Sequence, residues 1–175
     1  MSSERAYELD QYYTNTDIVK RCLNTIDLSI YDLVVEPSAG EGAFYNLLDH
    51  PNKIGIDLEP KCDGVIEQDF LTWKLDNFPP RVLTIGAPPF GLGIGVGYQL
   101  ALDFIEHAST FSTTIAFILP NGFKKQVVHN RVPLNFWKTI EIDIPGDSFT
   151  FKGEPFKGFP CVWNIYEKRN KVRLH

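Results

Sequence analysis

Apolar and polar positions along this chain of 175 residues follow patterns that predict strands separated by helices. Helical spacing of apolar residues predicts helices over 18–26 and 98–109, and the small residues after 37 predict a turn into a further helix over 42–49. Apolar and alternating runs predict strands over 33–37, 53–58, 64–70, 81–86, 113–120, 136–144 and 161–169.

Strands joined by helices predict an α/β fold with a doubly wound, mostly parallel, Rossmann-like sheet of seven strands and helices on both faces. The last two strands are joined by a long stretch with no helical pattern, so we expect the last strand to be antiparallel. The length suits a single domain over 1–175. In such a sheet, ligands bind beyond the carboxyl ends of the strands, which should bring residues 36–42, 56–59, 68–70 and 86–90 to one edge.

The first of these segments reads EPSAGEG (36–42). Gly40 and Gly42 permit a tight turn and a close approach of the backbone to a ligand. The N–H groups at the start of the expected helix would suit a carboxylate or a phosphate, and Glu36 would suit an ammonium or a hydroxyl. The pattern differs from the dinucleotide fingerprint G-x-G-x-x-G, and a glycine turn that binds nothing is the plain alternative.

Acidic residues end the next two strands. Asp57 follows the glycine turn by about 20 residues, a position from which a carboxylate can accept both hydroxyls of a ribose. Asp69 and Phe70 end the following strand and would suit an adenine amine and an adenine face. Asp is common at strand ends, so only the combination of these spacings predicts a nucleoside-binding edge.

Four of these motifs together resemble a known family. EPSAGEGAF (36–44), GIDLEP (55–60) and QDF (68–70) resemble the cofactor motifs of class I S-adenosylmethionine-dependent methyltransferases. GAPPFG (86–91) resembles the N-P-P-F motif of the enzymes in that class that methylate the exocyclic N6 amine of adenine. DQYYTN (10–15) resembles a segment that precedes the glycine motif in some of them. The resemblance covers roughly residues 10–120.

The resemblance implies a role for each matching residue. The methionine part of the cofactor would be surrounded by Glu36, Ser38, Gly40 and Gly42. Asp57 would hold the ribose hydroxyls, and Asp69 and Phe70 the adenine. The cofactor would be capped by Gln11, Tyr13 and Thr14. The methyl-transfer corner would consist of Ala87, Pro88, Pro89 and Phe90.

The chemistry of that corner makes Ala87 the unexpected residue. An exocyclic amine is a weak nucleophile, and hydrogen-bond acceptors localise its lone pair and stabilise the positive charge that grows on nitrogen. The Pro88 carbonyl is held by proline geometry, and Phe90 could stack on a base that is unpaired or flipped out. The family has Asn or Asp at position 87, and the methyl group of Ala87 accepts nothing. We consider an engineered inactivation, a natural silent homologue and an altered reaction, beside the plain alternative of a strand-ending turn.

Candidates for contact with a substrate lie later in the chain. Phe149, Lys157 and Phe159 belong to a stretch (146–160) in which aromatic residues alternate with lysines, which suits bases and phosphates but equally suits a loop packed on the core. Lys124 and Lys125 could contact a phosphate or be an ordinary solvated surface. Trp163 is expected in the core, and His107 is expected to be structural or exposed rather than catalytic. Basic residues outnumber acidic ones after residue 120, although the net charge of −5 argues against tight non-specific binding to a duplex.

The cysteines complete the picture. Three well-separated cysteines fit neither a disulfide framework nor a metal site, and they favour a reducing intracellular setting, cytoplasmic or nuclear. No stretch is apolar enough to span a membrane. We expect methyl transfer from S-adenosylmethionine to adenine N6 in DNA or RNA, weakened by Ala87, with specificity from the 91–97 loop, the 146–160 stretch, a partner protein or a second copy. The alternatives are a non-catalytic, cofactor-binding subunit, and methylation of another planar amine such as a glutamine amide or guanine N2.

Overall fold

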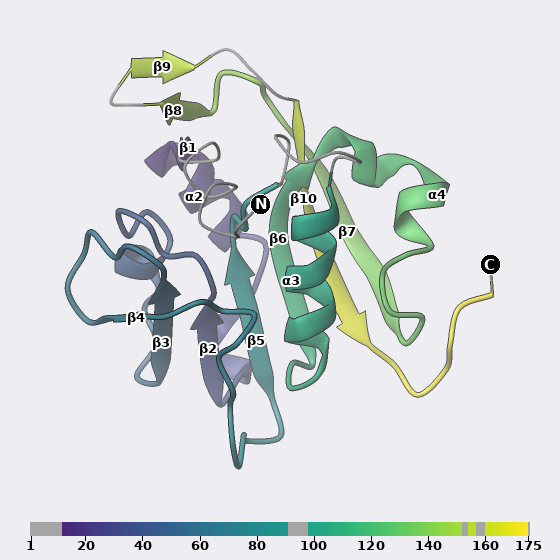
Figure 1. Ribbon diagram of the computed structural model, residues 1–175. Helices are drawn as coiled ribbons and strands as arrows, with labels where there is room; N and C mark the ends of the chain where they lie inside the picture. Colours follow the sequence, from purple (N-terminus) through teal and green to yellow (C-terminus); the bar gives the residue numbers. More distant parts are fainter. Residues whose placement is uncertain (1–11, 91–97, 152–153, 157–159, 175) are drawn as a thin grey trace.

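The centre of the molecule is a seven-stranded sheet (Figure 1). The structure is a computed structural model that describes residues 12–90, 98–151, 154–156 and 160–174, with the backbone alone for 12–13, 149–151 and 154–156. Across the sheet, the strands are β4 (Val65–Glu67), β3 (Lys53–Asp57), β2 (Leu33–Glu36), β5 (Val82–Gly86), β6 (Thr114–Pro120), β10 (Cys161–Lys168) and β7 (Phe136–Ile144).

The pairing of the strands confirms the predicted fold class. β2, β3, β4, β5 and β6 pair in parallel, whereas β10 is antiparallel to both β6 and β7. The strand order changes direction between β2 and β5, because the chain first builds outward through β3 and β4 and then crosses to the other side of β2. A crevice at the carboxyl edge is expected at such a point.

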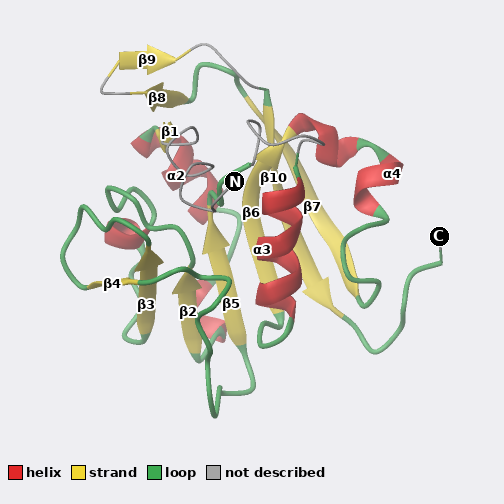
Figure 2. Cartoon of the chain, viewed as in Figure 1, coloured by secondary structure: helices red, strands yellow, loops and turns green. Residues whose placement is uncertain are grey.

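Alternation along the central strands sends their side chains to two separate cores. Val35 and Phe117 belong to the core covered by α3 (Gln99–Ser109), and Val34 and Ile118 belong to the core covered by α2 (Thr16–Leu23). Figure 2 shows α3 lying across the near face of the sheet. Both faces of β2, β5 and β6 are therefore buried, which explains why these three strands read as continuous apolar runs.

The expected helix over 42–49 is wrong. This region forms only the 3₁₀ turn η2 (Tyr45–Leu47). Lys53, which lies on β3, donates from Nζ to the carbonyl oxygens of Tyr45 at 2.9 Å and Leu48 at 3.2 Å. The lysine thus binds the Tyr45 carbonyl, which the expected helix would have paired with an N–H group of its own, and the Leu48 carbonyl, which would have stayed unpaired in the last turn of that helix.

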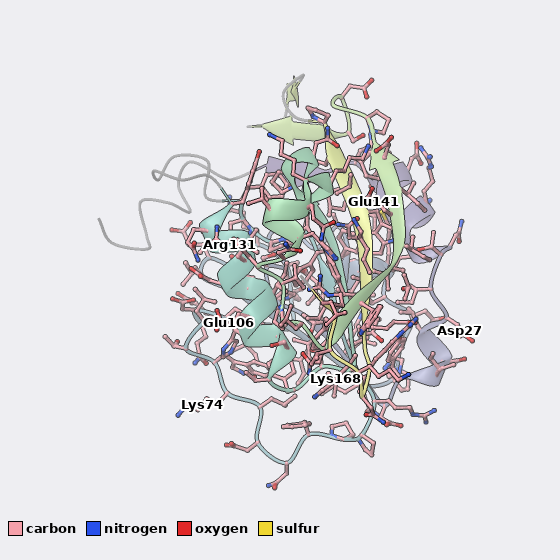
Figure 3. The ribbon with its side chains drawn as sticks, turned by 90° about the vertical axis from the view of Figure 1, so that its right-hand side faces the viewer. Asp27, Lys74, Glu106, Arg131, Glu141 and Lys168 are labelled. Atoms are coloured by element: carbon pink, nitrogen blue, oxygen red, sulfur yellow. The ribbon has the colours of Figure 1, made fainter. Side chains whose placement is uncertain are left out.

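A second, small sheet forms from two distant parts of the chain. β1 (Tyr12–Thr14) pairs antiparallel with β8 (Phe149–Phe151), which pairs antiparallel with β9 (Glu154–Phe156). The Asn15 N–H also donates to the Ser148 carbonyl at 2.8 Å. Figures 1 and 3 both show the β8–β9 hairpin at the end of the molecule where the parallel strands have their carboxyl ends.

The remaining short elements are η1 (Leu28–Ile30), η3 (Asn121–Lys124) and α4 (Gln126–His129). The segment after β10 is tied back to α4 by Arg173, which is 8% exposed. Its guanidinium donates to the Val132 carbonyl at 2.8 Å and to His129 Nε2 at 2.7 Å. Burial and the nearby Arg173 charge lower the pKa of His129 to about 4. None of the described helices is long and apolar enough to cross a membrane.

Candidate active site

Three strand ends are joined by hydrogen bonds at the carboxyl edge of the sheet. β2 ends at Glu36, β3 ends at Asp57 and β5 ends at Gly86. Ser38, just after β2, donates from its hydroxyl to the Ala87 carbonyl at 2.9 Å. The Gly40 N–H donates to Asp57 Oδ2 at 2.7 Å. The glycine turn, the acidic end of β3 and the start of the APPF segment therefore form one connected site, at the point where the strand order changes direction.

Glu36 is the buried acid of this site. The residue is 1% exposed, and its Oε1 accepts a hydrogen bond from the Ser38 N–H at 3.1 Å. Burial raises the pKa of the Glu36 carboxyl well above its usual value, the Ser38 N–H opposes this effect, and the Asp57 carboxylate adds to it. A buried acid of this kind suits a ligand that brings a positive charge.

The glycine turn has the tight geometry that the sequence predicts, although the expected helix N-terminus does not follow it. Gly40 and Gly42 have positive φ angles of 53° and 87°. The Gly42 N–H donates to the Ala39 carbonyl at 2.7 Å, and Gly40 also accepts from the Lys61 N–H at 3.1 Å. The expected row of free helical N–H groups is replaced by a compact turn that is tied to β3 and to the segment after it, by hydrogen bonds to Ile56, Asp57 and Lys61.

Asp57 combines structural contacts with access to the site. Its Oδ2 accepts from Gly40, and its Oδ1 accepts from the Glu59 N–H at 2.8 Å. The residue is partly exposed. Each carboxylate oxygen can accept more than one hydrogen bond, so the group retains capacity for the hydroxyls of a ligand.

The structure brings Asp69 to this edge but turns Phe70 away from it. The Gln68 N–H donates to the Asp57 carbonyl at 2.9 Å, which links the 68–70 segment to β3. Asp69 is partly exposed, and its Oδ1 accepts from the Leu71 N–H at 2.9 Å. Phe70 is 1% exposed and packs in an aromatic cluster with Trp73, Phe104, His107 and Phe111. The expectation that its ring covers an adenine face is wrong, because the ring completes the α3-side core.

The two expected structural residues are confirmed. His107 belongs to the same aromatic cluster, and its Nε2 lies 2.8 Å from the Trp73 carbonyl oxygen. Trp163 is fully buried, and its indole N–H donates to the Thr25 hydroxyl at 2.9 Å.

The APPF segment directly follows Gly86, the residue that lies against Glu36. Pro88 and Pro89 are buried, and Ala87 is partly buried against the α2-side core. Phe90 is 7% exposed and packs in the same core, so the described conformation offers little of its ring to a base. Stacking on a base would therefore need a movement of this ring.

The other expected site residues are placed as follows. Thr14 is buried at the end of β1, next to the β8 strand. Tyr13 and Phe149 lie in β1 and β8, where the backbone alone is described. Lys125 is exposed, and Lys124 forms an ion pair with Asp143 at 2.5 Å, so part of its charge is neutralised. Gln11, Lys157 and Phe159 lie outside the described residues.

From the sequence, Gly86 is expected at this edge without a role, and Cys62 is missed. A Cβ placed on Gly86 would lie 2.4 Å from Glu36 Oε1, so the acid needs a glycine opposite it. A Cβ on Gly42 would lie 3.0 Å from Cys62 Sγ, which puts this thiol beside the glycine turn. The only sequence feature that points to Gly86 is its position directly before the APPF segment. No sequence feature points to Cys62.

Two further observations limit the site. The described residues contain no group of three or more His, Cys, Asp or Glu side chains arranged for a metal ion. A cavity of about 830 Å³ lies at the opposite, amino edge of the sheet, near Asp32, Lys53 and Arg81. It contains none of the motif residues, so we place the candidate site at the carboxyl edge.

Comparisons with known proteins establish the fold. No family model matches the chain, and no curated protein matches its sequence. An inferred RNA methyltransferase from Pyrococcus horikoshii is 18% identical with a TM-score of 0.63, and the match covers 91% of this chain and 87% of that one. The 23S rRNA methyltransferase ErmE is 18% identical with a TM-score of 0.61, over 91% of this chain and 70% of that one. Magnesium protoporphyrin IX methyltransferase (ChlM) from Synechocystis PCC 6803, solved with bound S-adenosylmethionine, is 12% identical with a TM-score of 0.55, over 87% and 77%. The chain therefore has the fold that these methyltransferases share.

Proposed function

We propose that this chain binds S-adenosylmethionine at the carboxyl edge of β2, β3 and β5, and that the adjoining corner serves methyl transfer to the N6 amine of adenine in a nucleic acid. The observation that carries the proposal is the hydrogen-bonded junction of the glycine turn, Asp57 and Ala87 at the change in strand order. The shared fold supports it, since ErmE acts on rRNA and ChlM was solved with this cofactor.

The donor set fits the cofactor. Glu36 is a buried acid suited to the cationic amino-acid end, and Asp57 has acceptor capacity for the ribose hydroxyls. Asp69 can accept from the adenine amine, while the Phe70 ring takes no part because it packs among the aromatic side chains of the α3-side core. The cofactor supplies the methyl group on a sulfonium that already activates it, so the protein has to bind, orient and exclude water.

At the transfer corner, this chain's own groups would act on the amine that receives the methyl group. The Ala87 carbonyl already accepts one hydrogen bond, from the Ser38 hydroxyl. The Pro88 carbonyl is the acceptor that we assign to an amine hydrogen, and the two prolines leave this stretch without N–H donors. A target adenine would have to leave its base pair to reach the corner. Lys124 and Lys125 could contact phosphates beside it.

Position 87 weakens this corner. An Asn side chain there would supply a second acceptor for the growing positive charge on nitrogen, and the Ala87 methyl group supplies none. Loss of one such group costs on the order of 100- to 1,000-fold in rate. This single observation favours a second candidate function, a subunit that binds the cofactor without catalysing transfer and acts through a partner protein or a second copy.

Two measurements test the proposal. The first is titration calorimetry of S-adenosylmethionine binding to the wild type, to Asp57→Ala and to the exposed control Asp63→Ala. We expect Asp57→Ala to weaken binding about 10-fold or more, for the loss of hydrogen bonds to a charged group, and the control to bind normally. Absence of binding to the wild type would refute the proposal.

The second measurement is methyl transfer by Ala87→Asn to adenine-containing single- and double-stranded DNA and RNA. We expect a gain of about 100-fold or more over the protein with Ala87 on one of these polymers. Ala87→Leu is the matched control, since leucine has a size similar to asparagine and no acceptor. Silence of Ala87→Asn on every polymer, with the cofactor still bound, would favour the non-catalytic subunit.

A further inference from the structure

Glu36 is a buried acid whose charge no described residue balances. It is 1% exposed and its Oε1 receives one N–H, from Ser38 at 3.1 Å. The backbone of β5 closes against this oxygen, because a Cβ on Gly86 would lie 2.4 Å from it. No Lys, Arg or His among the described residues forms an ion pair with Glu36.

Of the titratable groups near Glu36, Asp57 on β3 makes a negative charge there less favourable. The Cys62 thiol, in the segment after β3, adds no charge of its own, because burial first and then the neighbouring acids, Glu36 among them, raise its pKa. β5 contributes the backbone of Gly86, which is neutral. An isolated carboxylate in an apolar interior is expensive, and a group in this position ordinarily binds a proton instead.

This arrangement changes when a positive charge arrives. An ammonium group beside the carboxyl would favour the ionised form by charge pairing, at short range and in a region that excludes water. S-adenosylmethionine carries an α-ammonium at its amino-acid end. A neutral nucleoside thioether has no such group and would leave the acid as it was.

We infer that Glu36 holds a proton in the ligand-free protein and releases it when the ammonium group of the ligand binds, so that the acid selects ligands with a cationic amino-acid end. This inference rests on the proposed function. In the exchange, the carboxylic acid loses its proton to the solvent and the resulting carboxylate pairs with the ammonium. No bond of the ligand breaks, and one proton leaves for each ligand bound.

The experiment is titration calorimetry at neutral pH in two buffers with different ionisation enthalpies, which counts released protons. The ligands are S-adenosylmethionine, S-adenosylhomocysteine, which keeps the ammonium without the sulfonium, and 5′-methylthioadenosine, which has neither. We expect about one proton released with the first two ligands and none with the third. Release with S-adenosylmethionine alone would assign the effect to the sulfonium and overturn the role of the ammonium.

Two variants sharpen the result. Glu36→Gln should release no proton and should bind the two amino-acid ligands about 10- to 100-fold more weakly, with little change for 5′-methylthioadenosine. Glu67→Gln, an exposed acid at the end of β4, should behave as the wild type. Binding of S-adenosylmethionine to the wild type without proton release would overturn this inference and leave the proposed function standing. Absence of binding would instead refute the proposed function.

A measurement on the wild type alone covers the case in which Glu36→Gln fails to fold. Infrared difference spectra, with and without S-adenosylhomocysteine, report the carbonyl stretch of protonated carboxylic acids. We expect this band to disappear on binding as the carboxylate forms. A band that persists under saturating ligand would contradict the inference.

Discussion

A methyl group added at residue 86 would test how closely the end of β5 is matched to Glu36. In Gly86→Ala the new Cβ would lie 2.4 Å from Glu36 Oε1 and 3.1 Å from its Cδ, well inside ordinary contact. The φ angle of 151° at this residue is one that residues with a side chain rarely adopt. The substitution therefore strains the backbone and displaces the carboxyl group at the same time.

The backbone strain and the displacement of Glu36 each contribute to the loss of stability, and each contribution can be given a magnitude. The backbone strain costs about 1–3 kcal/mol, as for other residues held in sparsely populated conformations. Displacement of Glu36 removes its hydrogen bond from the Ser38 N–H, which contributes about 1 kcal/mol. We therefore expect Gly86→Ala to lower the free energy of unfolding by about 2–4 kcal/mol.

The assay is urea denaturation followed by tryptophan fluorescence, in a double-mutant cycle with Glu36→Ala. With the carboxyl group absent, the added methyl group has room, and the cost of Gly86→Ala should fall to the backbone strain alone. We expect a coupling energy of about 1 kcal/mol between the two positions. A cost below about 0.5 kcal/mol for Gly86→Ala, typical of a surface substitution, would refute the close approach of Gly86 to Glu36.

Three further outcomes follow from the described contacts. Cys62 is partly exposed, whereas Cys22 and Cys161 are 2% and 1% exposed, so a thiol reagent should label Cys62 faster than the other two. Saturating S-adenosylmethionine should slow the labelling of Cys62, and an unchanged rate would contradict a ligand beside Gly42. The pKa of His129 is lowered to about 4 in the folded protein, so between about pH 6.5 and 4 the unfolded chain binds a proton that the folded protein does not. The free energy of unfolding should therefore decrease as the pH falls from about 6.5 to 4, by about 1–2 kcal/mol after allowance for solvent screening. His129→Gln should remove this acid-dependent loss in urea titrations. Arg173→Ala should lower the free energy of unfolding by about 2–4 kcal/mol. Arg173→Lys should lose less of this stability than Arg173→Ala but should stay below the original protein, because a lysine does not reproduce the several fixed N–H donors of arginine. Equal stability of all three proteins would contradict the anchoring of the last segment.

Several features of the fold could be predicted because the information is local. β7 spans Phe136–Ile144, as its alternating pattern predicts, and β6 is buried along its whole length, as its continuous apolar run predicts. The antiparallel last strand followed from the absence of a helical pattern before it. The glycine turn, the acidic strand ends and the APPF segment were placed at one edge because parallel strands share the direction of their carboxyl ends.

Contacts between distant residues decided the rest. Lys53 pairs with the Tyr45 carbonyl that a helix over 42–49 would have used, and β1 pairs with β8, more than a hundred residues away. The Phe70 ring turns toward α3 because an aromatic cluster there fills the core, and no local pattern records that choice.

The sequence by itself determined the hydrophobic period of each helix and strand and the residues of each short motif, since both depend on residues a few positions apart. The order of the motifs is simply their order along the chain. Only the tertiary structure decided that the Ser38 hydroxyl meets the Ala87 carbonyl and that Glu36 lies sealed against Gly86. The physical reason is that burial, and with it the charge of an acid, depends on every segment packed around a side chain.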